Sequence, residues 1–65
     1  MKRAIDYVNE EALILKVIGR CFTLNISLVE YRQSRKAKKY FNQFLEVEVE
    51  DVDIKENTIT LYVKN

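Results

Sequence analysis

In LILKVIGRCFTLNIS, residues 13–27, two alternating apolar runs flank a Gly-Arg pair, and this pattern is the strongest indication of the fold. Apolar side chains at every second position are typical of a β-strand with one buried face. Gly19-Arg20 fits a two-residue type II′ turn, in which glycine occupies the first central position. The stretch therefore predicts a β-hairpin in which Ile18 faces Cys21.

The predicted turn also sets the register of this hairpin. Leu15 faces Leu24, and the strongest apolar positions all fall on one side of the ribbon. The reverse side carries Ile14 and Ile18 among polar residues, and these two side chains need cover. A barrel rim, a partner subunit or a ligand would each supply it.

After the hairpin the apolar residues recur every three or four positions, which predicts one helix. Ser34 is the expected N-cap. The residues that share the helical spacing are Ala37, Tyr40, Phe41, Phe44 and Leu45. Ser27-x-x-Glu30 also matches a capping box. A single helix that began there would turn Glu30 toward the buried side, so we place the start at Ser34.

Strands are expected on both sides of these elements. Residues 4–8 predict a short first strand, residues 46–50 alternate strictly, and residues 58–63 form the last strand. The apolar parity slips near Glu50-Asp51, which predicts a β-bulge. Asn57 is the natural residue for a left-handed turn position. The core expected from these elements is Leu15, Val17, Phe22, Leu24, Ile26, Phe41, Phe44, Ile59 and Leu61.

The predicted order is β-β-β-α-β-β in a single α+β domain, residues 1–65, that is small, antiparallel and β-rich. This order and a lysine-rich stretch resemble small modules of the oligonucleotide-binding (OB) type, such as bacterial translation initiation factor one. The resemblance implies a small barrel with one helix. The alternative is an open antiparallel sheet with the helix on one face.

The composition excludes several classes of site. The 65 residues include one Cys, one Gly and no His. An internal disulfide, a Cys/His zinc site, an imidazole-based catalytic triad and a glycine-rich phosphate loop are all ruled out. We therefore expect no enzyme, no metal site and no cofactor. One free cysteine and no signal-peptide core predict a cytoplasmic protein.

Charge is the most informative feature of the chain. Residues 32–45 carry five cations and no acid, whereas residues 46–65 have a local charge of −4. A dense, one-sided cluster of cations is suited to phosphate contacts, and neighbouring aromatic rings can stack on unpaired bases. The candidate nucleic-acid-binding residues are Arg32, Arg35, Lys36, Lys38, Lys39, Tyr31 and Tyr40.

We therefore predict a small module that binds DNA or RNA with low sequence specificity. A solvated helix whose cations pair with the acids of the next strand is the plain structural alternative. The functional alternative is a small protein-binding module or inhibitor of the kind viruses deploy, acting through the acidic strand or the mixed hairpin face. A homodimer that covers Ile14 and Ile18 is the third hypothesis.

Overall fold

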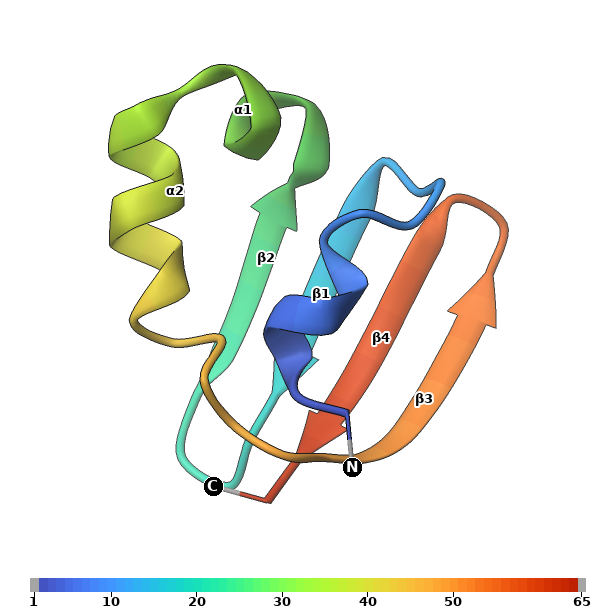
Figure 1. Ribbon diagram of the computed structural model, residues 1–65. Helices are drawn as coiled ribbons and strands as arrows, with labels where there is room; N and C mark the ends of the chain where they lie inside the picture. The colour runs from blue at the N-terminus through green and yellow to red at the C-terminus, as the bar shows by residue number, and fades with distance from the viewer. Residues whose placement is uncertain (1, 65) are drawn as a thin grey trace.

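The computed structural model describes residues 2–64 as a four-stranded mixed sheet with helices on one face (Figure 1). The α+β class predicted from the sequence is confirmed. In chain order the elements are the 3-10 helix η1 (Ala4–Tyr7), strands β1 (Ile14–Ile18) and β2 (Thr23–Ser27), helices α1 (Leu28–Gln33) and α2 (Arg35–Asn42), and strands β3 (Val49–Lys55) and β4 (Thr58–Val63).

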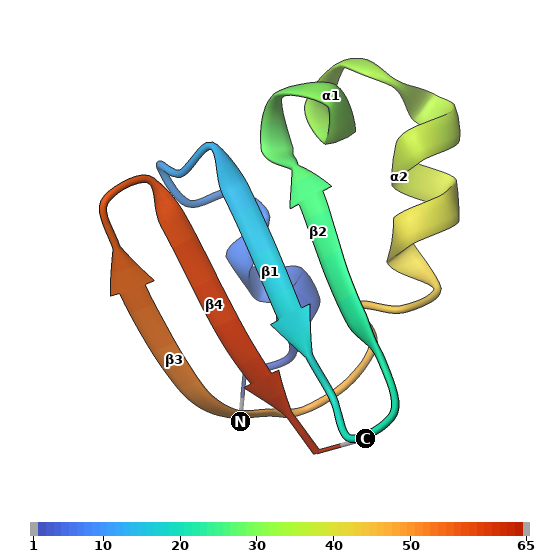
Figure 2. The same ribbon diagram turned by 180° about the vertical axis from the view of Figure 1, so that it is seen from behind.

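The sheet is open, and the predicted barrel is wrong. Its strand order is β2-β1-β4-β3, with β1 and β4 parallel at the centre and an antiparallel hairpin partner outside each. The all-antiparallel arrangement is therefore wrong as well. Figure 2 shows the strands from behind, with no helix on that face. The sheet thus has one covered face and two edge strands, β2 and β3. At the start of β3, the Val49 N–H donates to the Lys2 carbonyl at 3.1 Å, so residues 2–3 pair with that end of its edge.

Residues 4–8 were predicted to form the first strand, but residues 4–7 form the helix η1 instead. The sheet therefore lacks a strand that would help to close a barrel. The Arg3 N–H donates to the Asp6 carboxylate at 2.9 Å, which closes a tight turn. The next two backbone N–H groups donate to the carbonyls of Val47 and Leu45, both at 2.9 Å. The segment therefore lies across the helical face of the sheet and holds the connection between α2 and β3 in place.

The β1–β2 hairpin forms, but its predicted register is wrong by two residues. Ile18 pairs with Thr23, and four residues rather than two connect the strands. The Gly19 N–H donates to the Phe22 carbonyl at 2.9 Å, and this glycine has a negative φ, so no type II′ turn forms. Because the shift is even, every strand residue keeps its predicted face. Leu13 falls outside β1 and is 52% exposed.

Two helices replace the single predicted helix. The Ser27 hydroxyl accepts from the Glu30 N–H at 3.5 Å, so helix α1 begins with Ser27 as its N-cap, a start that a single helix would not allow. Ser34 ends α1 and caps α2, as predicted, by accepting from the Ala37 N–H at 3.2 Å. Because the backbone at Ser34 is extended, α1 and α2 are not one continuous helix, and the buried side of α1 does not set the buried side of α2. The prediction that the helical region begins only at Ser34 is therefore wrong: α1 follows Ser27, and Glu30 stays exposed because α1 ends before α2 begins.

The core lies between the helices and the covered sheet face. Five predicted core residues are buried, namely Leu15, Val17, Ile26, Ile59 and Leu61. Phe22, Leu24 and Phe41 are partly buried against them, and Phe44 is partly buried beside a surface hollow. The core also contains side chains outside that nine-residue set, among them Val63, whose inward direction the alternation of the last strand predicts: Ala4, Val8, Ala12, Leu28, Tyr31, Leu45 and Val63.

The β3–β4 hairpin confirms one prediction and corrects another. A register shift lies between Val49 and Asp51, where the slip in apolar parity predicted a bulge. The turn residue with a positive φ is Glu56, at 56°, and not Asn57. Since Lys55 pairs with Thr58, the turn has two central residues, and only the first is left-handed.

Candidate nucleic-acid interface

The exposed side of α2 gathers four of the five predicted cations. These side chains are Arg35, Lys36, Lys38 and Lys39, and all of them are exposed. Among residues 2–64 the one salt bridge joins Arg3 to Glu46 at 2.7 Å. The cations of α2 are therefore not paired with the acids of the following strand. This arrangement leaves them available to anions from solution.

Tyr40 stands among these cations with its ring 55% exposed. Its ring meets those of Phe41 and Phe44 edge to face, with centroids 5.1 and 5.6 Å apart. Such contacts favour one ring orientation and so reduce the entropy that a ligand would have to remove. Lys36, Lys39 and Gln43 line a shallow depression together with Tyr40. One helix face thus presents an aromatic ring in the same depression as two ammonium groups.

The other two predicted residues belong to α1 and make internal contacts. Tyr31 is 5% exposed, and its hydroxyl donates to the Asn42 side-chain oxygen of α2. Arg32 donates from one guanidinium nitrogen to the carbonyls of Val8 and Glu10, at 2.9 and 2.6 Å. Both residues hold neighbouring segments together. The Ser27 capping box was the sequence signal that would have separated α1 from α2.

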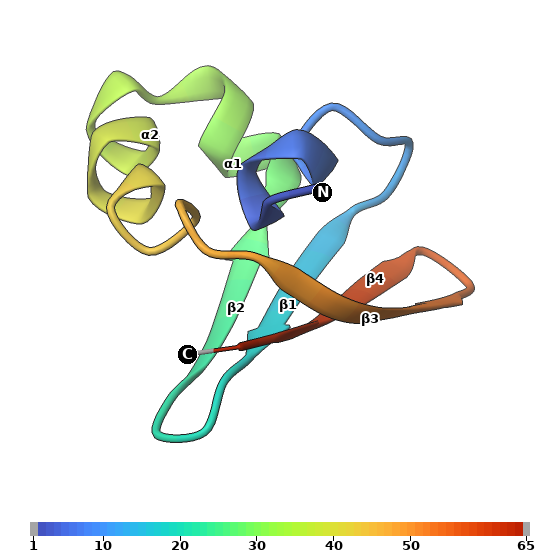
Figure 3. The ribbon, with the colours of Figure 1, turned by 60° about the horizontal axis from the view of Figure 1, so that its bottom comes forward.

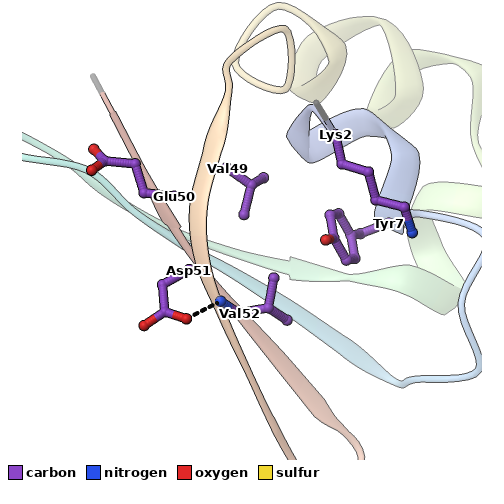
Figure 4. Close-up of a pocket in the computed structure, with 6 residues that line it drawn as sticks. All are labelled: Lys2, Tyr7, Val49, Glu50, Asp51 and Val52. Carbon is purple, nitrogen blue, oxygen red and sulfur yellow. Dashed lines mark hydrogen bonds between the residues drawn. The ribbon is translucent and has the colours of Figure 1, made fainter.

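Strand β3, which carries Glu50, Asp51 and Asp53, lies at the opposite edge of the sheet from β2 and α2 (Figure 3). Figure 4 shows Glu50 and Asp51 pointing away from Lys2 and Tyr7, which face the opposite side of the strand. The Lys2 ammonium lies 4.9 Å from the centre of the Tyr7 ring. An Asp51 carboxylate oxygen accepts from the Val52 N–H at 2.9 Å, so this side chain supports the bulge.

The described residues form no acidic or thiol cluster suited to a metal. No group of three or more His, Cys, Asp or Glu side chains comes together within residues 2–64. Cys21 is a free, exposed thiol in the β1–β2 loop.

Ile14 and Ile18, the side chains for which the sequence predicted some form of cover, lie on the uncovered face of the sheet. Ile14 is 42% exposed and Tyr62 is 41% exposed. Ile18 and Tyr62 are neighbours there across the parallel β1–β4 pair. Association of two copies through this face stays a prediction.

Comparison of the chain with protein-family models, with curated proteins and with solved structures finds no significant match. Within residues 2–64 no helix has the length and apolar character needed to cross a membrane.

Proposed function

We propose that the protein binds nucleic acid through the exposed face of α2, with little dependence on base sequence. The observation that carries the proposal is the cluster of four exposed cations on one helix without an acid or an ion-pair partner among residues 2–64. Cations in this arrangement neutralise phosphates and release condensed counterions. Helix α2 has only lysine and arginine as ionisable groups beside Tyr40, so its field attracts anions from every exposed direction.

Tyr40 favours an unpaired strand over a duplex. Its exposed ring lies in the same depression as Lys36 and Lys39, so a base can stack on it while the adjacent phosphates meet the ammonium groups. Bases in a duplex already stack on one another and offer no free face. The buried ring of Tyr31 has no role in this contact.

The test compares two triple variants with the same change in net charge. Arg35, Lys36 and Lys39 are replaced by glutamine in the first. The control replaces Arg20, Lys55 and Lys64, which are also exposed but lie outside the helices. Fluorescence anisotropy with a mixed-sequence single-stranded oligonucleotide measures binding over a salt series. Removal of each ammonium or guanidinium group that touches a phosphate should reduce the slope of log affinity against log salt by about one.

The first variant is expected to bind weakly at low salt and to converge with the wild type at high salt. The control should retain the wild-type slope. Truncation of Tyr40 to alanine should weaken single-strand binding more than duplex binding. Equal slopes for the two triple variants would show that net charge, and not the face of α2, determines the interaction. No binding by the wild type at about 50 mM salt would reject the proposal.

A further inference from the structure

Helix α2 lies beyond the β2 edge of the sheet rather than over the strands (Figures 1 and 3). No residue of α2 is buried, and its inward side chains Ala37 and Phe41 are only partly covered. The apolar side of an amphipathic helix is normally covered by the layer beneath it. Here the sheet ends one strand too early to provide that cover.

An apolar hollow occupies the space between β2 and the end of α2. Its volume is about 320 Å³. The lining side chains are Phe22, Leu24, Gln43, Phe44 and Val47. Gln43 also lines the depression that holds Lys36 and Lys39, so the apolar hollow and the cationic face adjoin.

The backbone of β2 has free hydrogen-bonding groups along this hollow. Pairing of Phe22 with Gly19 and of Leu28 with Leu13, each through a hydrogen bond of 2.9 Å, defines the ladder between the two strands. Hydrogen-bonded positions alternate along an antiparallel strand. The N–H and C=O groups of Thr23 therefore point outward, as do those of Asn25, and β2 is the last strand of the sheet.

We propose that the groove between β2 and α2 binds an extended acidic peptide segment of a partner protein, which adds a fifth strand to the sheet. Its backbone pairs with Thr23 and Asn25, and an apolar side chain enters the hollow. Acidic residues two positions away, on the same face of the added strand, lie toward Lys36 and Lys39. This peptide site is additional to the phosphate contacts proposed above, although it shares these two lysines.

Two features favour a peptide over a nucleic acid in this groove. The edge of β2 offers alternating donors and acceptors, which a peptide backbone complements, whereas a phosphodiester only accepts. The hollow requires an apolar side chain. Charge selects the composition of the peptide, because the helix that lines the groove has four cations and no acid. Lysine or arginine side chains in the peptide would be repelled by these four cations.

The experiment uses the full chain and a blocked peptide of about six residues, the usual length of a strand, in which a valine has a glutamate two positions away on each side and threonine fills the other positions. A peptide in which lysine replaces glutamate tests the charge requirement. Titration followed by amide NMR spectra measures binding, and hydrogen exchange reports on the amides of Thr23 and Asn25. We expect these two amides to exchange more slowly in the presence of the glutamate peptide.

A proline at the edge provides the variant. Asn25→Pro removes one outward N–H without removing a bond to β1, and proline is tolerated on such an edge. Asn25→Ala is the matched control, because it shortens the side chain and keeps the N–H. The proline variant is expected to bind the glutamate peptide about tenfold more weakly than the alanine variant.

Methylated peptides test the same contact if the proline variant does not fold. N-methylation on the peptide edge that faces β2 should abolish binding to the wild-type protein, and N-methylation on the opposite edge should not. Equal binding of the two methylated peptides would overturn the proposal, as would equal binding of the lysine peptide. Protection of the Thr23 amide at high protein concentration without peptide, or by an oligonucleotide, would assign this edge to a different occupant and also overturn it.

Discussion

The two edge strands of the sheet, β2 and β3, differ in how they meet solvent. The β3 edge carries Glu50, Asp51 and Asp53, all exposed, and a bulge interrupts its pairing. Charges and bulges are the usual devices that prevent a further strand from joining an edge. The β2 edge has neither, because its outward residues Thr23 and Asn25 are neutral and its pairing is regular. The fold therefore blocks one edge and leaves the other available.

The two edge strands also differ in how well their side chains are packed. In β2, Ile26 is fully buried, and the helix that follows this strand adds Leu28 to the core. In β3, Val49 and Val52 are partly covered, and Ile54 is 69% exposed. The β2 side of the molecule thus provides most of the packing, although its edge is open. The β3 side is weakly packed, although its edge is protected.

The largest expected effect comes from one substitution made on each of the two strands. Ile26→Ala removes a fully buried side chain and should lower the free energy of unfolding by about 2–5 kcal/mol. Ile54→Ala changes an exposed side chain and should lie within about 0.5 kcal/mol of the wild type. Urea denaturation measures both. Similar decreases would show that the two edge strands contribute equally to the core.

A smaller difference is expected between two arginines. Arg32 donates to two backbone carbonyls that follow η1, so Arg32→Met should cost about 1.5 kcal/mol while keeping the apolar stem. Arg3 forms an exposed salt bridge with Glu46, and Arg3→Met should cost less than about 1 kcal/mol.

Salt separates these two effects. The destabilisation by Arg3→Met should disappear in 1 M sodium chloride, where screening is strong, whereas most of the destabilisation by Arg32→Met should persist. Thermal unfolding at both salt concentrations measures this. If the effect of Arg32→Met also disappeared at high salt, its hydrogen bonds to the two carbonyls would contribute little to stability.

The smallest expected effects concern the two hairpin connections. Gly19 has a negative φ, so Gly19→Ala should stabilise the protein by about 0.5 kcal/mol through the unfolded chain. Glu56 has a φ of 56°, and Glu56→Gly should stabilise it by a similar amount, about 0.5 kcal/mol, by relieving a left-handed side-chain clash. Each change should raise the melting temperature by about 3 °C. A decrease in melting temperature for Gly19→Ala would contradict the negative φ of Gly19 and indicate a turn that requires glycine.

Much of the local structure could be predicted from the sequence. The apolar alternation assigned the residues of β1, β2 and β4 to the correct faces even though the first hairpin register was wrong by two positions. Face depends only on whether a position is odd or even, so an even error leaves it unchanged. The slip in parity near Glu50 located the bulge for the same reason.

Most residues of the candidate interface could also be predicted from the sequence. A serine cap and a run of cations without acids place Arg35, Lys36, Lys38 and Lys39 on one helix, and the structure leaves them exposed and unpaired among residues 2–64. The internal contacts of Tyr31 and Arg32 could not be predicted from the sequence. Both depend on contacts with residues distant in the sequence, namely Asn42 and the segment after η1.

Local sequence therefore specifies the strand faces, the cap of α2 and the segregation of charge, since each follows from neighbours a few residues apart. Long-range packing, in contrast, sets β1 parallel to β4, leaves the sheet open and places α2 past β2. The partners of a strand are chosen by which buried faces fit together across the whole chain. That choice depends on contacts between distant residues, which local periodicity does not specify.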